Sequence, residues 1–129
     1  MGIEAHIYTR MSGFAGLTAL VGTRISPNKL GQHTDLPAIS YRRVASERPS
    51  NMAADIGIVR SRYQFDIWAD SYDGMIAVKE QVIDCWQRYE GTQNSTEIIQ
   101  AFIMLDMDMY EDESRVHHGI VDVEINYRE

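Results

Sequence analysis

The chain is poor in residues on which several classes of structure and function depend. It has one cysteine, Cys85, and three prolines among 129 residues. A single cysteine excludes an internal disulfide and suits a reducing compartment. No apolar run approaches the roughly 20 residues that span a bilayer, and residues 1–13 lack the apolar core of a secretory signal. We expect neither a membrane span nor a leader.

Motifs of the common catalytic and metal sites are also absent. The chain has no glycine-rich phosphate loop, no Gly-x-Ser-x-Gly elbow and no zinc-ligand spacing. His117 and His118 are adjacent, so on a strand they point to opposite faces and are poorly placed to ligate one metal. Cys85 lies beside Trp86 on an apolar helix face, which is typical of a buried, unreactive thiol. We expect no metal site and no cofactor.

Charge is distributed unevenly along the chain. The net charge is −7, yet residues 1–64 carry +4 and residues 65–129 carry −11. One interpretation is that basic and acidic patches on one subunit meet on neighbouring copies, as a head-to-tail ring requires. The other is that the two halves interleave in space and their charges mix. The sequence alone leaves both open.

Hydrophobic periodicity predicts the order α-β-β-β-α-β-β. Helical spacing covers residues 3–21, with a break near Gly13, and residues 72–89. Extended segments are predicted at residues 23–26, 38–45, 58–70, 97–110 and 116–127, and loops at residues 27–37 and 46–57. We expect an α+β fold in a single domain, residues 1–129, with one mainly antiparallel sheet of four to five strands and two helices packed on one face.

Residues 58–70 predict a strand with two different faces. Its odd positions are mostly apolar and its even positions mostly charged, so one face is expected to pack under the helices and the other to stay uncovered. The same alternation recurs in the strand at residues 97–110. The members predicted to share its apolar face are Ile99, Ala101, Ile103, Leu105, Met107 and Met109.

Four carboxylates on the last two predicted strands form an acidic cluster. Asp106 and Asp108 are two residues apart on one predicted strand, so they point to the same face of it. Asp122 and Glu124 are likewise two residues apart on the next strand. If these strands pair, we expect the four to gather on one surface. That surface could be an ordinary solvated face, a negative surface that repels nucleic acid, or an acid/base or metal site, which would also need a cleft.

Arginines and large apolar side chains mark a possible subunit interface. Arg42, Arg43, Arg60 and Arg62 lie on two predicted strands, where they could be solvated, paired across strands, or in contact with acids of an adjacent copy. Three apolar side chains on otherwise polar faces could form an interface patch. They are Trp68, Phe102 and Met104.

Several segments, taken in order, resemble the tail completion or tail terminator proteins of long-tailed phages, also called head–tail joining or minor tail proteins. LVGTRISP (residues 20–27) resembles their Val-Gly-x-Arg-Val/Ile-x-Pro pattern, and LPAISYRRVASERP (residues 36–49) resembles a strand followed by a polar hairpin. RYQFDIWADSYDGMIAVKEQV (residues 62–82) resembles their strand-to-helix passage, with Gln64, Asp66, Trp68, Ala69 and Tyr72 as its most specific part. The acidic segment at residues 110–112 then joins the last two strands. Met75–Ile76 stand where the family commonly has small residues.

The resemblance implies a protein that is not an enzyme and binds no cofactor. It implies a homo-oligomeric ring, expected to be a hexamer, at the head-proximal end of the tail in the virion, assembled in the host cytoplasm. The ring would end growth of the tail tube and contact the tube protein and the head connector, while DNA passes through without sequence-specific binding. Asp106, Asp108, Asp122 and Glu124 are then expected to line the lumen. Arg42, Arg43, Arg60, Arg62, Trp68, Phe102 and Met104 are expected at the subunit interface.

Two other functions stay open at this level. The first is a stopper or adaptor of the head–tail connector, which sequence separates poorly from a terminator. The second is a small hydrolase or ligand-binding domain that uses the acidic cluster, which would require a large pocket with convergent carboxylates.

Overall fold

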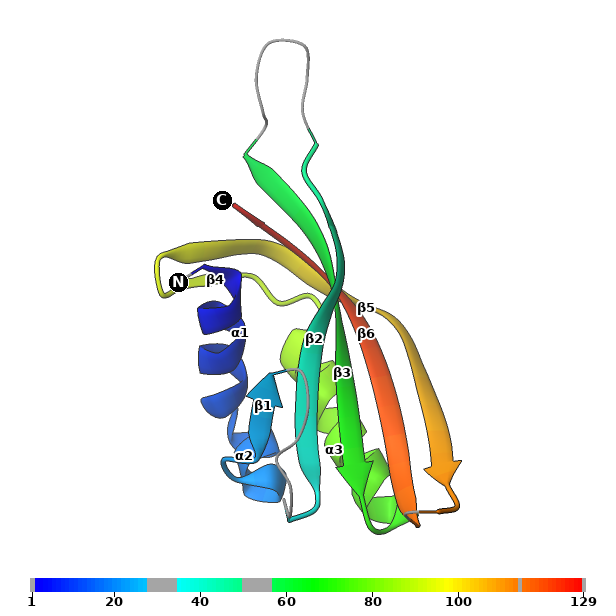
Figure 1. Cartoon of the computed structure of the whole chain (residues 1–129). Coiled ribbons are helices and arrows are strands. Elements are labelled where there is room, and N and C mark those ends of the chain that lie inside the picture. The colour runs from blue at the N-terminus through cyan, green and yellow to red at the C-terminus, as the bar shows by residue number, and fades with distance from the viewer. Residues whose placement is uncertain (1, 28–34, 50–56, 114, 129) are drawn as a thin grey trace.

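The computed structural model describes residues 2–27, 35–49, 57–113 and 115–128 (Figure 1). Within these residues there are three helices: α1 (Ile3–Ser12), α2 (Ala15–Val21) and α3 (Tyr72–Trp86). The strands are β1 (Ile25–Pro27), β2 (Ala38–Glu47), β3 (Ile58–Ala69), β4 (Gly91–Gln93), β5 (Thr96–Glu111) and β6 (Val116–Arg128). The helical segments and the long strands predicted from periodicity are confirmed, including the break in the first helical segment.

The strands form one strongly twisted, mixed sheet in the order β1-β2-β3-β6-β5-β4 (Figure 1). β1 runs parallel to β2, and the other neighbouring pairs are antiparallel. The prediction of four to five strands and two helices in the order α-β-β-β-α-β-β is therefore wrong, because the described residues form six strands and three helices. Gly13 splits the first helical segment, and β4 comes a few residues after α3, where the sequence predicts only a helix end.

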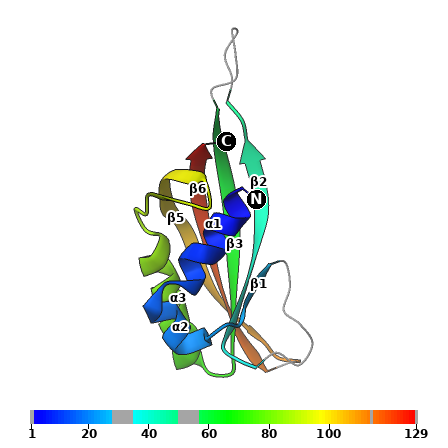
Figure 2. The same ribbon diagram turned by 90° about the vertical axis from the view of Figure 1, so that its left-hand side faces the viewer.

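All three helices lie on the same face of the sheet (Figure 2). The odd-numbered side chains of β3 point toward them and are buried, as the alternation predicts. Phe65 is central to this layer, because its ring stacks on Trp86 of α3 at 5.7 Å and lies 6.0 Å from Tyr41 of β2. The largest fully buried side chains are Trp86, Tyr63, Phe65, Ile7, Met11, Leu17, Ile39, Ile67, Met75, Ile98, Ile125 and His6.

Polar contacts hold α1 against the sheet and α3. The buried His6 donates from Nδ1 to the carbonyl oxygen of Thr96 (2.8 Å), so its Nε2 accepts from the hydroxyl of Tyr89 (2.8 Å). Burial lowers the pKa of His6, although the hydrogen bond to Thr96 opposes this, and the ring is held in its neutral form. Arg10 donates to the carbonyl oxygen of Cys85 near the end of α3 (2.9 and 3.2 Å). Burial raises the pKa of the Cys85 thiol to about 12, in agreement with a buried, unreactive cysteine.

Two register shifts divide β5 into three segments, and at each shift the odd-numbered and even-numbered side chains exchange faces of the sheet. The shifts fall between Ile98 and Gln100 and between Ile103 and Leu105. After the second shift, Asp106 lies opposite the core residue Val121, while Met107 lies opposite Ile120 on the other side. A bulge inserts one extra residue, and one residue is enough to send every later side chain to the opposite face. The predicted apolar face of residues 97–110 is therefore wrong at its start, where Ile98 and not Ile99 is buried opposite Tyr127, and again from Leu105 onward.

Two further expectations bear on the rest of the chain. The predicted loops at residues 27–37 and 46–57 fall largely on residues outside the described ranges. Among the helices of the described residues, none has the length and apolar character needed to cross a membrane.

Candidate assembly surface

One face of the sheet carries no helix, and we call it the uncovered face. Its direction follows from Gly119, because a Cβ atom there would lie 3.2 Å from Met75 of α3. Odd-numbered residues of β6 therefore point to the helices, and even-numbered residues point away from them. Side chains opposite one another on antiparallel strands share a face. The register assigns to the uncovered face Ser40, Arg42, Arg60, Arg62, Gln64, Asp66, Trp68, Phe102, Leu105, Met107, Met109, His118, Ile120, Asp122, Glu124 and Asn126.

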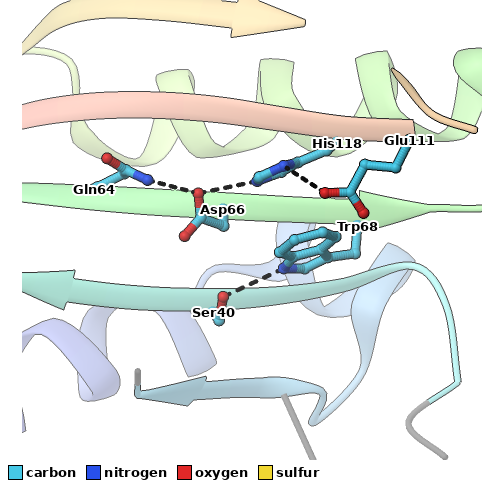
Figure 3. A network of polar contacts seen from close by, with 6 residues as sticks. All are labelled: Ser40, Gln64, Asp66, Trp68, Glu111 and His118. Atoms are coloured by element: carbon cyan, nitrogen blue, oxygen red, sulfur yellow. Dashed lines mark hydrogen bonds and ion pairs between the residues drawn. The ribbon is translucent and has the colours of Figure 1, made fainter. Parts of the chain in front are cut away.

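A compact polar network occupies one end of the uncovered face (Figure 3). The rings of Trp68 and His118 lie opposite each other on β3 and β6 and stack at 3.9 Å with 14° between their planes. His118 Nε2 is 3.0 Å from Asp66 Oδ1, which also accepts a hydrogen bond from Gln64 Nε2 at 2.8 Å. Trp68 Nε1 donates to Ser40 Oγ (3.3 Å). The network joins side chains of three adjacent strands, which makes this end of the face rigid.

Asp66 is held as a carboxylate by this network. Burial favours its neutral form, but hydrogen bonds from His118 and Gln64, with the charges of His118 and Arg42, outweigh burial and lower the pKa of Asp66. The ionised carboxylate in turn fixes the orientation of the imidazole. Glu111 Oε1 lies 3.9 Å from His118 Nδ1, on the other side of that ring (Figure 3).

Several polar atoms of the uncovered face are buried without a hydrogen bond. Arg62 Nη2 pairs with Asp122 Oδ2 at 2.8 Å, but Arg62 Nε and Asp122 Oδ1 have no hydrogen bond. Within the described ranges, four of the five buried side-chain nitrogen or oxygen atoms that lack a hydrogen bond are on this face: Arg62 Nε, His118 Nδ1, Asp122 Oδ1 and Asn126 Oδ1. Such atoms are rare in folded proteins because leaving them unpaired is costly. Their concentration on one face leaves hydrogen bonds there that water or another molecule can complete.

The four carboxylates of the predicted acidic cluster do not share a face. Asp122 and Glu124 lie on the uncovered face, whereas Asp106 and Asp108 point to the helix side. There both Asp106 (3.0 Å) and Asp108 accept hydrogen bonds from the buried Lys79 of α3. The expectation that all four gather on one surface is wrong, because the bulge in β5 reverses the parity of that strand.

The four arginines are also divided between the two faces. Arg42, Arg60 and Arg62 lie on the uncovered face, and Arg62 is already paired with a carboxylate of its own chain. Arg43 points to the helix side, where it donates to the hydroxyls of Tyr63 (3.2 Å) and Tyr127 (3.4 Å). Burial raises the pKa of Tyr63 to about 12, against the opposing effect of Arg43.

Large apolar side chains follow the second half of β5 and are unusually exposed. The exposed fractions are 46% for Met104, 40% for Leu105, 47% for Met107 and 41% for Met109. Sequence periodicity places the last three in the core and misses this patch. The alternation of methionine with aspartate in residues 104–109 gives no warning of it, because a face that contains Asp106 and Asp108 is an improbable core face, which favours the wrong assignment.

Features that would favour an enzyme are weak in the described part of the chain. A hollow of about 500 Å³ beside the start of α1 has Glu4 as its one lining carboxylate. No group of three histidine, cysteine, aspartate or glutamate side chains among the described residues is arranged to hold a metal ion.

The same fold occurs in a chain of a solved virion particle. A chain from a structure titled "Virion of native gene transfer agent (GTA) particle" superposes with a TM-score of 0.80 at 11% identity, over 98% of this chain and 95% of that one. At this identity the likeness shows the fold alone. No curated protein sequence matches the chain.

The particular family follows from the sequence itself. The family model described as "Tail completion protein gp17" matches residues 5–128, and the chain belongs to that family. The resemblance inferred from residues 20–27, 36–49 and 62–82 is thereby confirmed. The protein is a structural tail protein of a phage-type virion, and membership of this family indicates a structural role rather than catalysis.

Proposed function

We propose that the protein forms a ring, a hexamer, at the head-proximal end of the tail, where it ends growth of the tail tube and joins the tail to the head connector. The observation that carries this proposal is the family match over residues 5–128. The uncovered face supports it, because exposed methionines and unpaired buried polar atoms on one surface favour contacts with other subunits. Trp68, Phe102 and Met104 are proposed to take part in those contacts.

Loss of the protein is expected to change tail length. A terminator stops addition of tube subunits, so tails assembled without it should be longer than native tails and more variable in length. Electron microscopy of particles from a phage lacking the gene measures this, with the gene supplied in trans as the control. Tails of native length that fail to join filled heads would instead identify a stopper or adaptor, the alternative function.

We also propose that the part of the uncovered face around Asp122 and Glu124 lines the lumen through which DNA passes, while its large apolar side chains, on β5 and at Trp68, take part in the subunit contacts. Asp122 and Glu124 lie there, but Arg60 and Arg62 lie beside them, so the charge is mixed. A surface of alternating sign avoids the strong attraction that a basic lining would exert on DNA. Asp106 and Asp108 point to the other side of the sheet and are no longer proposed as lining residues.

Glu124→Lys is expected to slow DNA release without unfolding the protein. Glu124 is partly exposed and its carboxylate accepts a hydrogen bond from Asn126 at 3.2 Å, so little burial is lost. Each subunit would add a cation to the lumen, and the effect would be repeated in every copy. Ejection rate, measured by fluorescence of released DNA, should fall several-fold. Asp84→Lys, at an exposed position of α3, makes the same charge change on the helix side. Equal ejection rates in the two variants would contradict the lumen proposal.

A further inference from the structure

Two long strands have an edge with no strand partner within the described residues. β1 pairs with β2 only at Ile39–Tyr41, so the outer edge of β2 is unpaired over residues 42–47. β4 pairs with β5 only at Thr96–Ile98, so the far edge of β5 has no strand partner among the described residues over residues 105–110. Open edges of this length offer rows of backbone donors and acceptors to another strand. A protein that assembles can use them for that purpose.

The directions of the strands suit pairing between these two edges. Along β2, β3, β6 and β5 each strand is antiparallel to the next, so β5 runs opposite to β2. If β5 of one copy lay beside β2 of the next, the contact would also be antiparallel. The alternation would then continue through every copy without interruption, as a closed sheet of many subunits requires.

The unpaired segments lie at opposite ends of the sheet, which sets the offset between copies. Ala45 is opposite Arg62 of β3. Met107 is opposite Ile120 of β6, and Ile120 is opposite Asp66 of β3. Asp66 lies four residues farther along β3 than Arg62. Pairing Ala45 with Met107 thus shifts each copy by about 13 Å over four strand spacings of about 4.8 Å. That shift corresponds to a strand tilt of about 35°, at the lower end of the range for closed barrels.

The faces to which the side chains point restrict which residue of β5 can lie opposite Ala45. Ala45 lies on the uncovered face, so its opposite residue must be Leu105, Met107 or Met109, which share that face. Met109 opposite Ala45 gives a tilt of about 45°, still within the usual range, whereas Leu105 gives about 20°, which is too shallow for a closed barrel. Only Met107 and Met109 satisfy both conditions.

Charge agrees with both of the remaining registers. With Met107 opposite Ala45, Arg43 comes opposite Asp108, and both side chains point to the helix side. With Met109 opposite Ala45, Arg42 comes opposite Glu111, and both point to the uncovered face. Asp106 and Asp108 share a single cation, Lys79, so an arginine from a neighbour would balance the surplus negative charge.

From these observations we infer that copies of this chain join edge to edge, β5 of one subunit adding as an antiparallel strand to residues 42–47 of the next. The inference rests on the proposed ring and specifies how its subunits meet. It makes the contact heterologous, with a different edge on each side, so it closes around an axis and does not stop at a dimer. The exposed methionines of β5 are then covered by the neighbouring β2.

Disulfide trapping in assembled tails tests this contact. Ala45→Cys is combined with Met107→Cys in one variant and with Met109→Cys in another, and purified tails are oxidised and run on non-reducing gels. Within one chain, positions 45 and 107 are three strand spacings apart across the sheet, about 14 Å, and also about 13 Å apart along the strands, so they cannot form an internal disulfide. Cys85 is buried and its thiol pKa is about 12, so it does not compete. At least one variant should give a ladder of linked subunits.

Matched controls separate the possible outcomes. Ala45→Cys with Asp84→Cys carries the same number of thiols but places one on α3, and it should give no ladder. Ala45→Cys alone should stay monomeric, and a strong dimer band would indicate a symmetric contact and overturn the inference. Tails of native length and function that give no ladder in either test variant would also overturn it while leaving the proposed function intact. Native-length tails in the absence of the protein would overturn the proposed function itself.

Discussion

Phe65→Ala should lower the free energy of unfolding by about 3–5 kcal/mol, the usual cost of truncating a fully buried phenylalanine. Phe65 is 0% exposed, and its ring packs against Trp86 and Tyr41 between the sheet and α3. The loss is large compared with the total stability of about 5–15 kcal/mol typical of a domain. Urea denaturation followed by tryptophan fluorescence measures it, because Trp86 lies in direct contact with the altered site.

Phe102→Ala is the matched control on the opposite face of the sheet. Phe102 is only partly buried, and it lies opposite Glu124 on the uncovered face. We expect this variant to lose about 1 kcal/mol or less, but to assemble poorly, since the face is proposed to contact other subunits. Similar losses of stability in the two variants would contradict the assignment of one face to the core and the other to assembly.

The double change Arg42→Glu and Arg43→Glu should weaken assembly about tenfold or more, equivalent to about 1.4 kcal/mol or more. In the proposed contact these residues meet Asp108 or Glu111 of a neighbour, so reversal replaces attraction with repulsion. Size-exclusion chromatography with light scattering measures the shift from rings to monomers. In the native protein, raising the ionic strength to 1 M should weaken the ring in the same direction, because the Debye length falls to about 3 Å.

Two checks accompany the arginine variant. Arg43 also donates to Tyr63 and Tyr127 within its own chain, so a thermal melt must establish that the double variant is folded. Arg88→Glu with Arg115→Glu changes the net charge by the same amount at exposed positions outside residues 42–47 and 105–111. Rings that dissociate equally in both double variants would indicate a general effect of charge and would contradict a specific contact through β2.

The separate elements of the fold could largely be predicted from sequence. Strong periodicity marks β3, where every odd position from Val59 to Ala69 is buried, and α3, where Met75, Val78 and Val82 recur on one face. Of the two three-residue strands, β1 overlaps the extended segment predicted at residues 23–26, whereas β4 was not predicted. A strand of three residues shows no period, and β4 is defined by its pairing with β5.

The candidate surface was less accessible to sequence analysis. Parity alone predicted that Asp106 and Asp108 would join Asp122 and Glu124, but the extra residue near Met104 directs them toward Lys79. The stack of Trp68 on His118 depends on the register between β3 and β6. That register is a property of the paired strands together and cannot be inferred from either strand alone.

The sequence by itself determined the family, the succession of helices and long strands, and the two-faced character of β3, because these depend on residue types at local spacings. Only the tertiary structure decided which side chains of β5 meet the helices and which stay uncovered, and which strand edges remain open. The physical reason is that one inserted residue reverses the face of a strand at little local cost, while only pairing with β6 determines where that residue is accommodated.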